Sequence, residues 1–205
     1  MSMDLWEYQQ DEVMSEYYQE LCLSEFQERA IDEFTAERLS SYYVENSNLL
    51  VDSFRALEEA QKVSSLSPTS GLIMAAISIE IALKIGLLKP IVFGFVHSEA
   101  VAESISNAVV KQTGIDRFKT LLVTLLKEIS HVDIVTYKRS GTKLSLWDER
   151  GEVQKRRNMI SHKGSLSSSQ DCQFAIDVAE AILNELLPDV LTSLNLHLQN
   201  KVIVE

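Results

Sequence analysis

The sequence predicts an all-α protein, a helical bundle preceded by an acidic helical extension. Only seven glycines and three prolines occur in 205 residues, which disfavours an all-β architecture with many turns. Hydrophobic residues make up 45% of the chain, enough for one substantial core. Apolar residues recur every three or four positions through most of the chain, which is the period of an amphipathic helix.

We expect the extension to cover residues 1–45 and the helical domain to cover residues 46–205. Residues 1–60 hold fifteen acidic and three basic side chains, for a net charge of −12. Periodicity over residues 3–23 is weak, so this aromatic-containing stretch predicts one or two marginal helices that need a surface to dock on. Ser24, with Gln27 three residues later, is expected to begin a helix that reaches about Tyr43.

Residues 72–88 are apolar on nearly every side and predict the central helix of the bundle. Ser67-Pro68 supplies a cap and a proline at the first helical position. The two charges of this helix, Glu80 and Lys84, are four residues apart in the favourable order. Because they interrupt the apolar run, we expect a buried helix that ends at Lys89-Pro90, and no membrane contact.

Other segments show the same helical period. We expect Asn46 or Ser47 to cap a helix with Leu49, Leu50, Phe54, Leu57 and Ala60 on its inner face. A helix is expected from Ser98 to about Gln112, with one apolar face formed by Val101, Ile105, Ala108 and Val109. Helices are also expected over 115–129, 147–164 and 171–187, and a connector or buried turn over 91–96. Residues 131–146 leave two interpretations open, a small hairpin and a basic loop.

Several common classes of protein find no support in the sequence. Met1–Asp11 has neither a basic start nor an apolar run, so we expect no signal peptide and a cytoplasmic protein. Cys22 and Cys172 form no CxxC motif and predict two buried, reduced thiols. Four scattered histidines offer no metal site, and a glycine-rich phosphate loop is lacking, so we expect no metal and no cofactor.

A locally basic strip lies within this acidic chain, whose net charge is −11. Residues 138–163 hold eight basic and three acidic side chains, for a net charge of +5. A local field of this sign can attract nucleic acid even when the whole chain is acidic. The candidate RNA-binding residues of the strip are Lys138, Arg139, Lys143, Lys155, Arg156 and Lys163.

Arg157, Asn158 and His162 lie near the end of the helix predicted over 147–164. On a helix, Asn158 and His162 share a face, whereas Arg157 and His162 are about 140° apart and flank that face. Histidine can carry protons near neutral pH, and arginine can brace a phosphate in a fixed fork geometry. From these residues alone, a cationic last turn before Gly164 is explained more simply by helix capping than by catalysis.

The spacing Arg157-Asn158-x-x-x-His162, late in an all-α domain, resembles the RNxxxH form of the Rx4–6H motif of the HEPN superfamily. The helix over 71–88, with Ala75-Ala76, Glu80 and Lys84, is similar to an early core helix of that family. The similarity covers roughly residues 46–196. It does not extend to Gly164, where HEPN toxins neutralised by a partner nucleotidyltransferase often carry a tyrosine.

The resemblance implies a HEPN-like bundle that dimerises and combines two motifs in one cleft. It implies metal-independent endoribonuclease activity in a toxin or phage-defence role, with Arg157 and His162 catalytic and Asn158 orienting them. Glu80 is a second candidate that reaches Arg157, although a simple pair with Lys84 explains it better. The alternatives are a catalytically silent module that binds nucleotide, RNA or a protein, and a helical interaction protein without an active site. A neutralising protein partner, and an acidic extension that packs near the basic strip, are further expectations.

Overall fold

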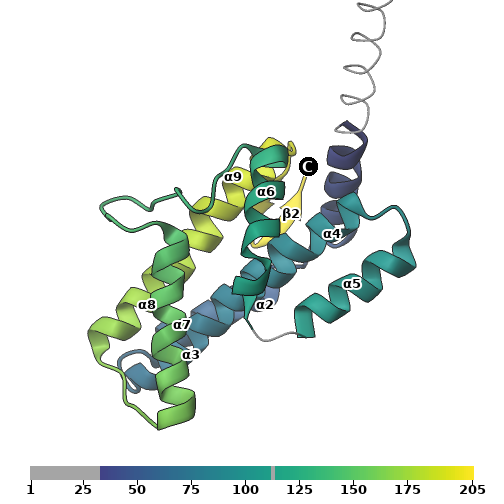
Figure 1. Ribbon diagram of the computed structural model, residues 1–205. Helices are drawn as coiled ribbons and strands as arrows, with labels where there is room; N and C mark the ends of the chain where they lie inside the picture. The colour runs from purple at the N-terminus through teal and green to yellow at the C-terminus, as the bar shows by residue number, and fades with distance from the viewer. Residues whose placement is uncertain (1–32, 112–113) are drawn as a thin grey trace, which may run out of the picture.

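The protein is all-α with one small hairpin at its C-terminal end. The computed structural model describes residues 33–111 and 114–205 (Figure 1). A helix runs through residues 33–45, and the later helices are α2 (Val51–Val63), α3 (Pro68–Ile81), α4 (Lys89–Phe95), α5 (Glu99–Lys111), α6 (Lys119–Ser130), α7 (Leu146–Lys163), α8 (Ser169–Ala181) and α9 (Leu187–Ser193). Short segments η1 (Ala82–Leu88), η2 (Ile115–Phe118) and η3 (Ile182–Leu186) join some of them, and β1 (His197–Gln199) pairs antiparallel with β2 (Val202–Val204).

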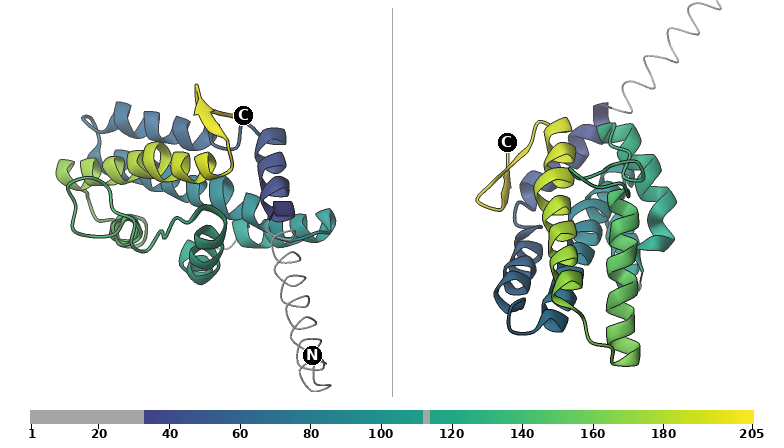
Figure 2. Two further views of the ribbon diagram at one scale, coloured as in Figure 1. Left: turned by 90° about the horizontal axis from the view of Figure 1, so that it is seen from above. Right: turned by 90° about the vertical axis from the view of Figure 1, so that its left-hand side faces the viewer.

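Helix α3 is the centre of the bundle, as predicted. It packs chiefly against α2 and α8, and α7 lies along it as well (Figures 1 and 2). Small residues allow the close approach: Ser53 and Ser78 exchange hydrogen bonds with each other's carbonyls at 2.7 and 2.9 Å. A Cβ added at Gly71 would lie 2.5 Å from the Cys172 sulfur. Ser67 caps α3 and Pro68 begins it, which confirms the predicted start.

The prediction that Lys89-Pro90 ends the central helix is wrong, because one continuous helix runs from Pro68 to Phe95. Residues 82–88 adopt a π-helical register, in which the Lys89 N–H bonds to the Lys84 carbonyl. Proline has no N–H for the carbonyl four residues earlier, which belongs to Gly86. The Tyr43 hydroxyl donates to that carbonyl instead, at 2.7 Å. Residues 91–96, expected as a connector, therefore belong mainly to α4.

The described part holds one helix with the length and composition of a membrane span, Pro68–Phe95. Its most apolar window is 67% buried inside the bundle, as expected for the core helix of a soluble protein. Charged Lys84 is itself buried within this helix. These observations support the predicted buried helix.

Residues 33–45 belong to the same hydrophobic core as the rest of the bundle. Leu39 and Tyr43 are buried and pack in the main cluster. The predicted helix start at Ser24 and the thiol of Cys22 lie outside the described residues, whereas the Cys172 thiol is free and buried as expected. The next cap was wrongly predicted: α2 begins at Val51, after a turn over residues 46–50, without a side-chain cap.

The sequence left open whether residues 131–146 form a hairpin or a loop, and the structure places the hairpin elsewhere. Residues 131–145 form a loop without strands, in which Ile134 is buried in the core and the Leu146 N–H donates to the Tyr137 carbonyl at 2.7 Å. The hairpin lies instead at β1 and β2, and its turn uses Asn200 and Lys201 with φ of 52° and 68°. Alternating apolar residues around an asparagine-containing turn are the sequence signal for it.

Candidate active site

Helix α7 carries the Arg157-Asn158-His162 motif, and both of its ends are well capped. The Ser145 hydroxyl accepts the Asp148 N–H at 3.2 Å. At the other end Gly164 has φ 65° and donates its N–H to the Ile160 carbonyl. The Ser165 N–H reaches the Met159 carbonyl, which completes a Schellman-type ending. The helix therefore extends as predicted, up to a glycine that favours its left-handed conformation.

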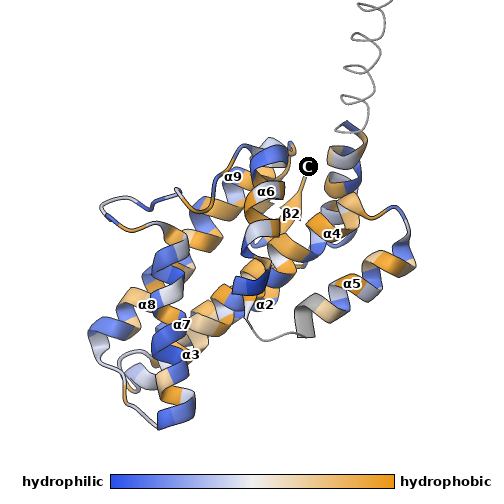
Figure 3. Cartoon of the chain, in the orientation of Figure 1, coloured by the Kyte–Doolittle hydropathy of each residue, from blue (hydrophilic) through white to orange (hydrophobic). Residues whose placement is uncertain are grey.

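The two halves of α7 lie in different surroundings. The first half is anchored in the core by Leu146, Trp147, Glu149, Arg150 and Val153, all of which are buried. After Val153 no α7 side chain is fully buried, and Met159 is 45% exposed. The polar second half of the helix is visible in Figure 3. The buried first half of α7 thus fixes the helix, and the more accessible second half carries the whole motif.

Two motif residues are in contact. Asn158 Oδ1 accepts a hydrogen bond from Arg157 Nη1 at 3.4 Å and one from Gln154 Nε2 at 3.0 Å. The side chain of Asn158 therefore lies against the guanidinium that it was expected to orient. His162 is exposed and forms no hydrogen bond with Arg157 or Asn158 within the described residues. One chain brings together the arginine and the asparagine, but not the histidine.

Glu80 forms the simple helical pair rather than a contact with the motif arginine. Its carboxylate accepts a hydrogen bond from Lys84 Nζ at 2.6 Å, within one turn of the central helix. Glu80 and Gln154 also line one small hollow between α3 and α7. Glu80 thus lies beside Gln154 of α7, three residues before Arg157.

Two candidate RNA-binding arginines form ion pairs with carboxylates of the protein itself. Arg156 Nε lies 3.1 Å from Asp171 Oδ1, and its guanidinium lies 4.8 Å from the centre of the Phe174 ring. Arg139 Nε donates to buried Glu149 at 2.8 Å and stands 5.9 Å from the same ring. The hydrogen bond to Glu149 raises the pKa of Arg139 above its usual value. Both arginines join α8 to the α7 side of the bundle.

The other candidate cations are more accessible. Lys138, Lys143 and Lys163 are exposed, and they form no ion pair with the rest of the described chain. Lys155 is exposed and pairs with Glu152 at 2.7 Å, which lowers the pKa of that carboxyl. Arg157 is half-buried and, like the three unpaired lysines, has no carboxylate partner in the part of the chain that the structure describes. The charge available to an anionic ligand therefore comes from these lysines and Arg157.

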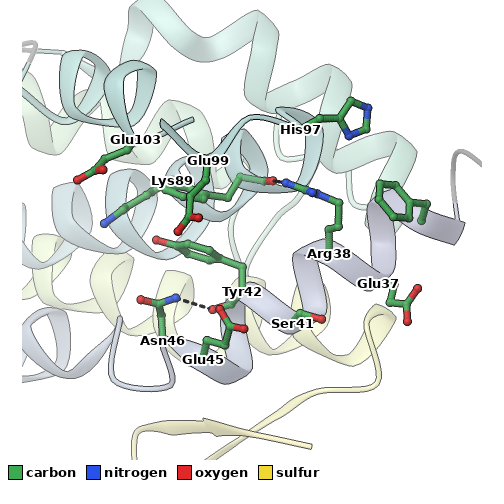
Figure 4. A pocket seen from close by; sticks show the side chains of 12 residues that line it. Glu37, Arg38, Ser41, Tyr42, Glu45, Asn46, Lys89, His97, Glu99 and Glu103 are labelled. Carbon is green, nitrogen blue, oxygen red and sulfur yellow. Dashed lines mark hydrogen bonds between the residues drawn. The ribbon is translucent and has the colours of Figure 1, made fainter. Parts of the chain in front are cut away.

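A hollow of about 930 Å³ lies elsewhere, between the helix over 33–45, α4 and the start of α5 (Figure 4). The Tyr42 ring stacks on Phe93 at its floor, with centroids 4.4 Å apart, and burial raises the pKa of Tyr42. Carboxylates surround it: Glu37, Glu45, Glu99 and Glu103. None of these residues stands out in the sequence, because the lining comes from segments about 50 residues apart. The hollow shares no residue with the motif.

Comparison with known proteins leaves the chain without an assigned relative. No protein-family model matches the sequence, and searches of curated proteins and of solved structures find no significant match. Within residues 33–111 and 114–205, no group of three or more His, Cys, Asp and Glu side chains is placed to hold a metal ion.

Proposed function

We propose that the protein is a metal-independent endoribonuclease of the HEPN type, with its active site on the second half of α7. The observation that carries the proposal is the contrast along this half-helix. His162 is exposed and Arg157 is half-buried, and neither has a carboxylate partner within the described residues, whereas the neighbouring Lys155 and Arg156 are paired. An unpaired guanidinium and an unpaired imidazole on one helix end can receive a phosphate and transfer protons to it.

The proposed reaction uses the ribose as the nucleophile. A base removes the proton of a 2′-hydroxyl, whose oxygen attacks the adjacent phosphorus, and the 5′-oxygen leaves with a proton from an acid. The products are a 2′,3′-cyclic phosphate and a free 5′-hydroxyl. Arg157 stabilises the charge that develops on the phosphoryl oxygens, and Asn158 keeps its guanidinium in place. His162 transfers protons.

A second copy of the chain completes the proposed site. Arg157 and His162 are five residues apart on one helix, so they point in directions about 140° apart. A two-fold axis beside α7 would bring a second histidine and a second arginine to the same phosphate. One imidazole would then act as the base and the other as the acid. Cytoplasmic location and a toxin or phage-defence role, with a neutralising protein partner, belong to the same proposal.

The experiment is cleavage of a mixed-sequence RNA in excess EDTA by the wild type, Arg157→Ala and His162→Ala. We expect cleavage by the wild type and a loss of at least about 100-fold in each variant, the scale of one proton-transfer group. The matched controls are His197→Ala and Arg55→Ala, whose residues are exposed and remote from the motif in the sequence. Cleavage that survives His162→Ala would overturn the mechanism.

A second candidate function is a module that binds RNA without cleaving it. The observation in its favour is that His162 makes no contact with the other two motif residues. In the same experiment, RNA binding by the wild type without cleavage at any protein concentration would support this candidate. Wild-type protein that neither binds nor cleaves RNA would support a helical interaction protein.

A further inference from the structure

Helix α5 does not bury the face that its amphipathic pattern predicts, although the side chain of Val109 lies outside the described ones. Its apolar residues were expected to face inward, yet Val101 is 49% exposed, Ile105 is 40% exposed and Ala108 is also exposed. The residues that it buries instead are Ala102 and Ser106. The apolar positions of α5 are coloured orange in Figure 3. Val101, Ile105 and Ala108 thus form an apolar face of α5 that the described residues leave exposed.

The contact that α5 does make is a poor one. It packs chiefly on α4 and η1. The buried Ser106 hydroxyl has no hydrogen-bond partner among the described residues. A buried polar group without a partner costs folding free energy, and an apolar stripe in water contributes none. Covering the outer face would therefore add stabilisation that the inner contact of α5 lacks.

The hollow beside α5 does not cover this face. Glu99 and Glu103 line the hollow. On a helix, Ile105 points about 160° away from Glu103. A ligand of the hollow would therefore leave Ile105 in water.

A second copy of the chain is a weak choice of occupant. Helix α5 has 13 residues, so it is about 20 Å long. A stripe one side chain wide along this length falls well short of the roughly 800 Å² per partner that a stable interface buries. The occupant is better supplied by the chain itself, because a tethered segment binds at high effective concentration.

The chain enters the described part beside the start of α5. The Phe34 ring lies 5.8 Å from His97, in the α4–α5 connection. Arg38 donates to the carbonyls of Phe93 and Val96 at 3.1 and 3.0 Å, which fixes this end of the helix over 33–45 to the end of α4. Before this point come 32 residues with apolar side chains for the face: Leu5, Trp6, Val13, Met14, Tyr17, Leu21 and Phe26.

We propose that residues 1–32 of the same chain pack on the α5 face formed by Val101, Ile105 and Ala108. Apolar side chains of the segment would cover the stripe, and its acidic side chains would remain in water. This interaction surface is independent of the proposed nuclease function. It lies at the end of the bundle where the described chain begins, away from the C-terminal end of α7 (Figures 1 and 2).

Hydrogen exchange of the full-length chain tests the proposal. Amide exchange in residues 1–32 is compared between the wild type, Ile105→Asp and the double variant Val101→Ala with Ile105→Ala. We expect exchange to become at least about tenfold faster in both variants, as for a segment released from its docking surface. Asn107→Asp is the matched control. It should leave the exchange of residues 1–32 unchanged, because Asn107 is exposed and lies about 160° from Ile105 on the helix.

The alanine double variant keeps the measurement decisive, since alanine preserves the helix if the aspartate disturbs it. Unchanged exchange of residues 1–32 in the double variant would overturn the proposal. So would faster exchange on Lys138→Ala with Lys163→Ala alone, which would place the segment on the basic strip. Sedimentation gives the third outcome. If the wild type has the mass of two chains, the double variant has the mass of one, and the exchange of residues 1–32 is the same in both, the face binds a second copy and the proposal is overturned.

Discussion

A single hydroxyl allows the central helix to continue past a proline. Pro90 is buried, and Tyr43 donates to the Gly86 carbonyl that a non-proline residue would have bonded. A buried carbonyl next to a proline therefore needs another donor, which Tyr43 supplies here.

Replacing Tyr43 by Phe should destabilise the fold by about 1–3 kcal/mol, since it leaves a buried carbonyl unsatisfied. Urea unfolding gives the free energy. The informative control is the same change in a Pro90→Ala background, where the new N–H can bond to Gly86. There the cost should fall below about 1 kcal/mol, and an equal cost in both backgrounds would contradict the role of Tyr43.

Alkaline pH should destabilise the protein partly through the same tyrosine. Burial, and then the charge of Tyr42, raise the pKa of Tyr43 far above its usual 10.0. The unfolded state ionises first, so this stability is complete below pH 10 and is lost as the pH rises toward the folded pKa. Tyr43→Phe should lose about 1 kcal/mol less than the wild type between pH 9 and pH 11, measured by urea unfolding. Parallel losses in the two proteins would contradict this assignment.

Residue-level signals explain which predictions from the sequence succeeded. Ser67-Pro68 and Gly164 act through their own backbone and the next turn, so the sequence alone predicts the helix ends they define. The continuation through Pro90 depends on Tyr43, which is 47 positions away. The loop over 131–145 is similar: its conformation depends on Ile134 entering the core and on Tyr137 donating to Asp189 at 2.8 Å.

At the scale of elements, α7 divides the basic strip into a structural part and an accessible part. Arg139 and Arg156 both contact the Phe174 ring, and each pairs with a carboxylate of α8. Lys138 and Lys143 extend from the loop before α7 and are exposed. The sequence predicted one basic patch, because charge counts do not reveal which cations have carboxylate partners on another helix.

Arg139→Ala should therefore act mainly on stability. It would strand the buried carboxylate of Glu149 and cost about 3 kcal/mol, measured by thermal or urea unfolding. The double variant Lys138→Ala with Lys143→Ala should unfold like the wild type. If both lysines contact phosphates, this variant should reduce the slope of log RNA affinity against log salt by about 1.4. A lysine double variant that is destabilised, together with an Arg139→Ala variant that is not, would contradict the division into structural arginines and accessible lysines.

Helix α5 shows where amphipathic pattern and packing disagree. Its apolar period correctly predicted a helix, but the face turned to the bundle carries Ala102 and Ser106. Periodicity identifies a face that is to be covered, without identifying what covers it. The sequence therefore predicted helix α5 but not which of its faces packs on the bundle.

At the scale of the whole molecule, the proposed site needs two chains. Specific activity should then fall on dilution below the dimer dissociation constant, with cleavage rate rising as the square of protein concentration in that range. Sedimentation at the same concentrations should show the mass falling from two chains to one. Constant specific activity across the dissociation range would contradict a composite site and would favour a cleft within one chain.

The fold class was predictable because helical period and low glycine content are spread over the entire sequence. The candidate site was predictable only as a pattern of three residues. Its geometry depends on which half of α7 the core holds, and that follows from Trp147, Arg150 and Val153 packing inward.

The chemistry of the products tests the central claim most directly. An RNA cleaved by the wild type is compared with the same RNA carrying 2′-deoxyribose at the cleaved position, both in excess EDTA. Attack by the 2′-hydroxyl should give a 2′,3′-cyclic phosphate and a 5′-hydroxyl from the first substrate, and no cleavage of the second at that position. Cleavage of the deoxy-substituted strand, or products with a 5′-phosphate, would contradict an attack by the 2′-hydroxyl assisted by Arg157 and His162.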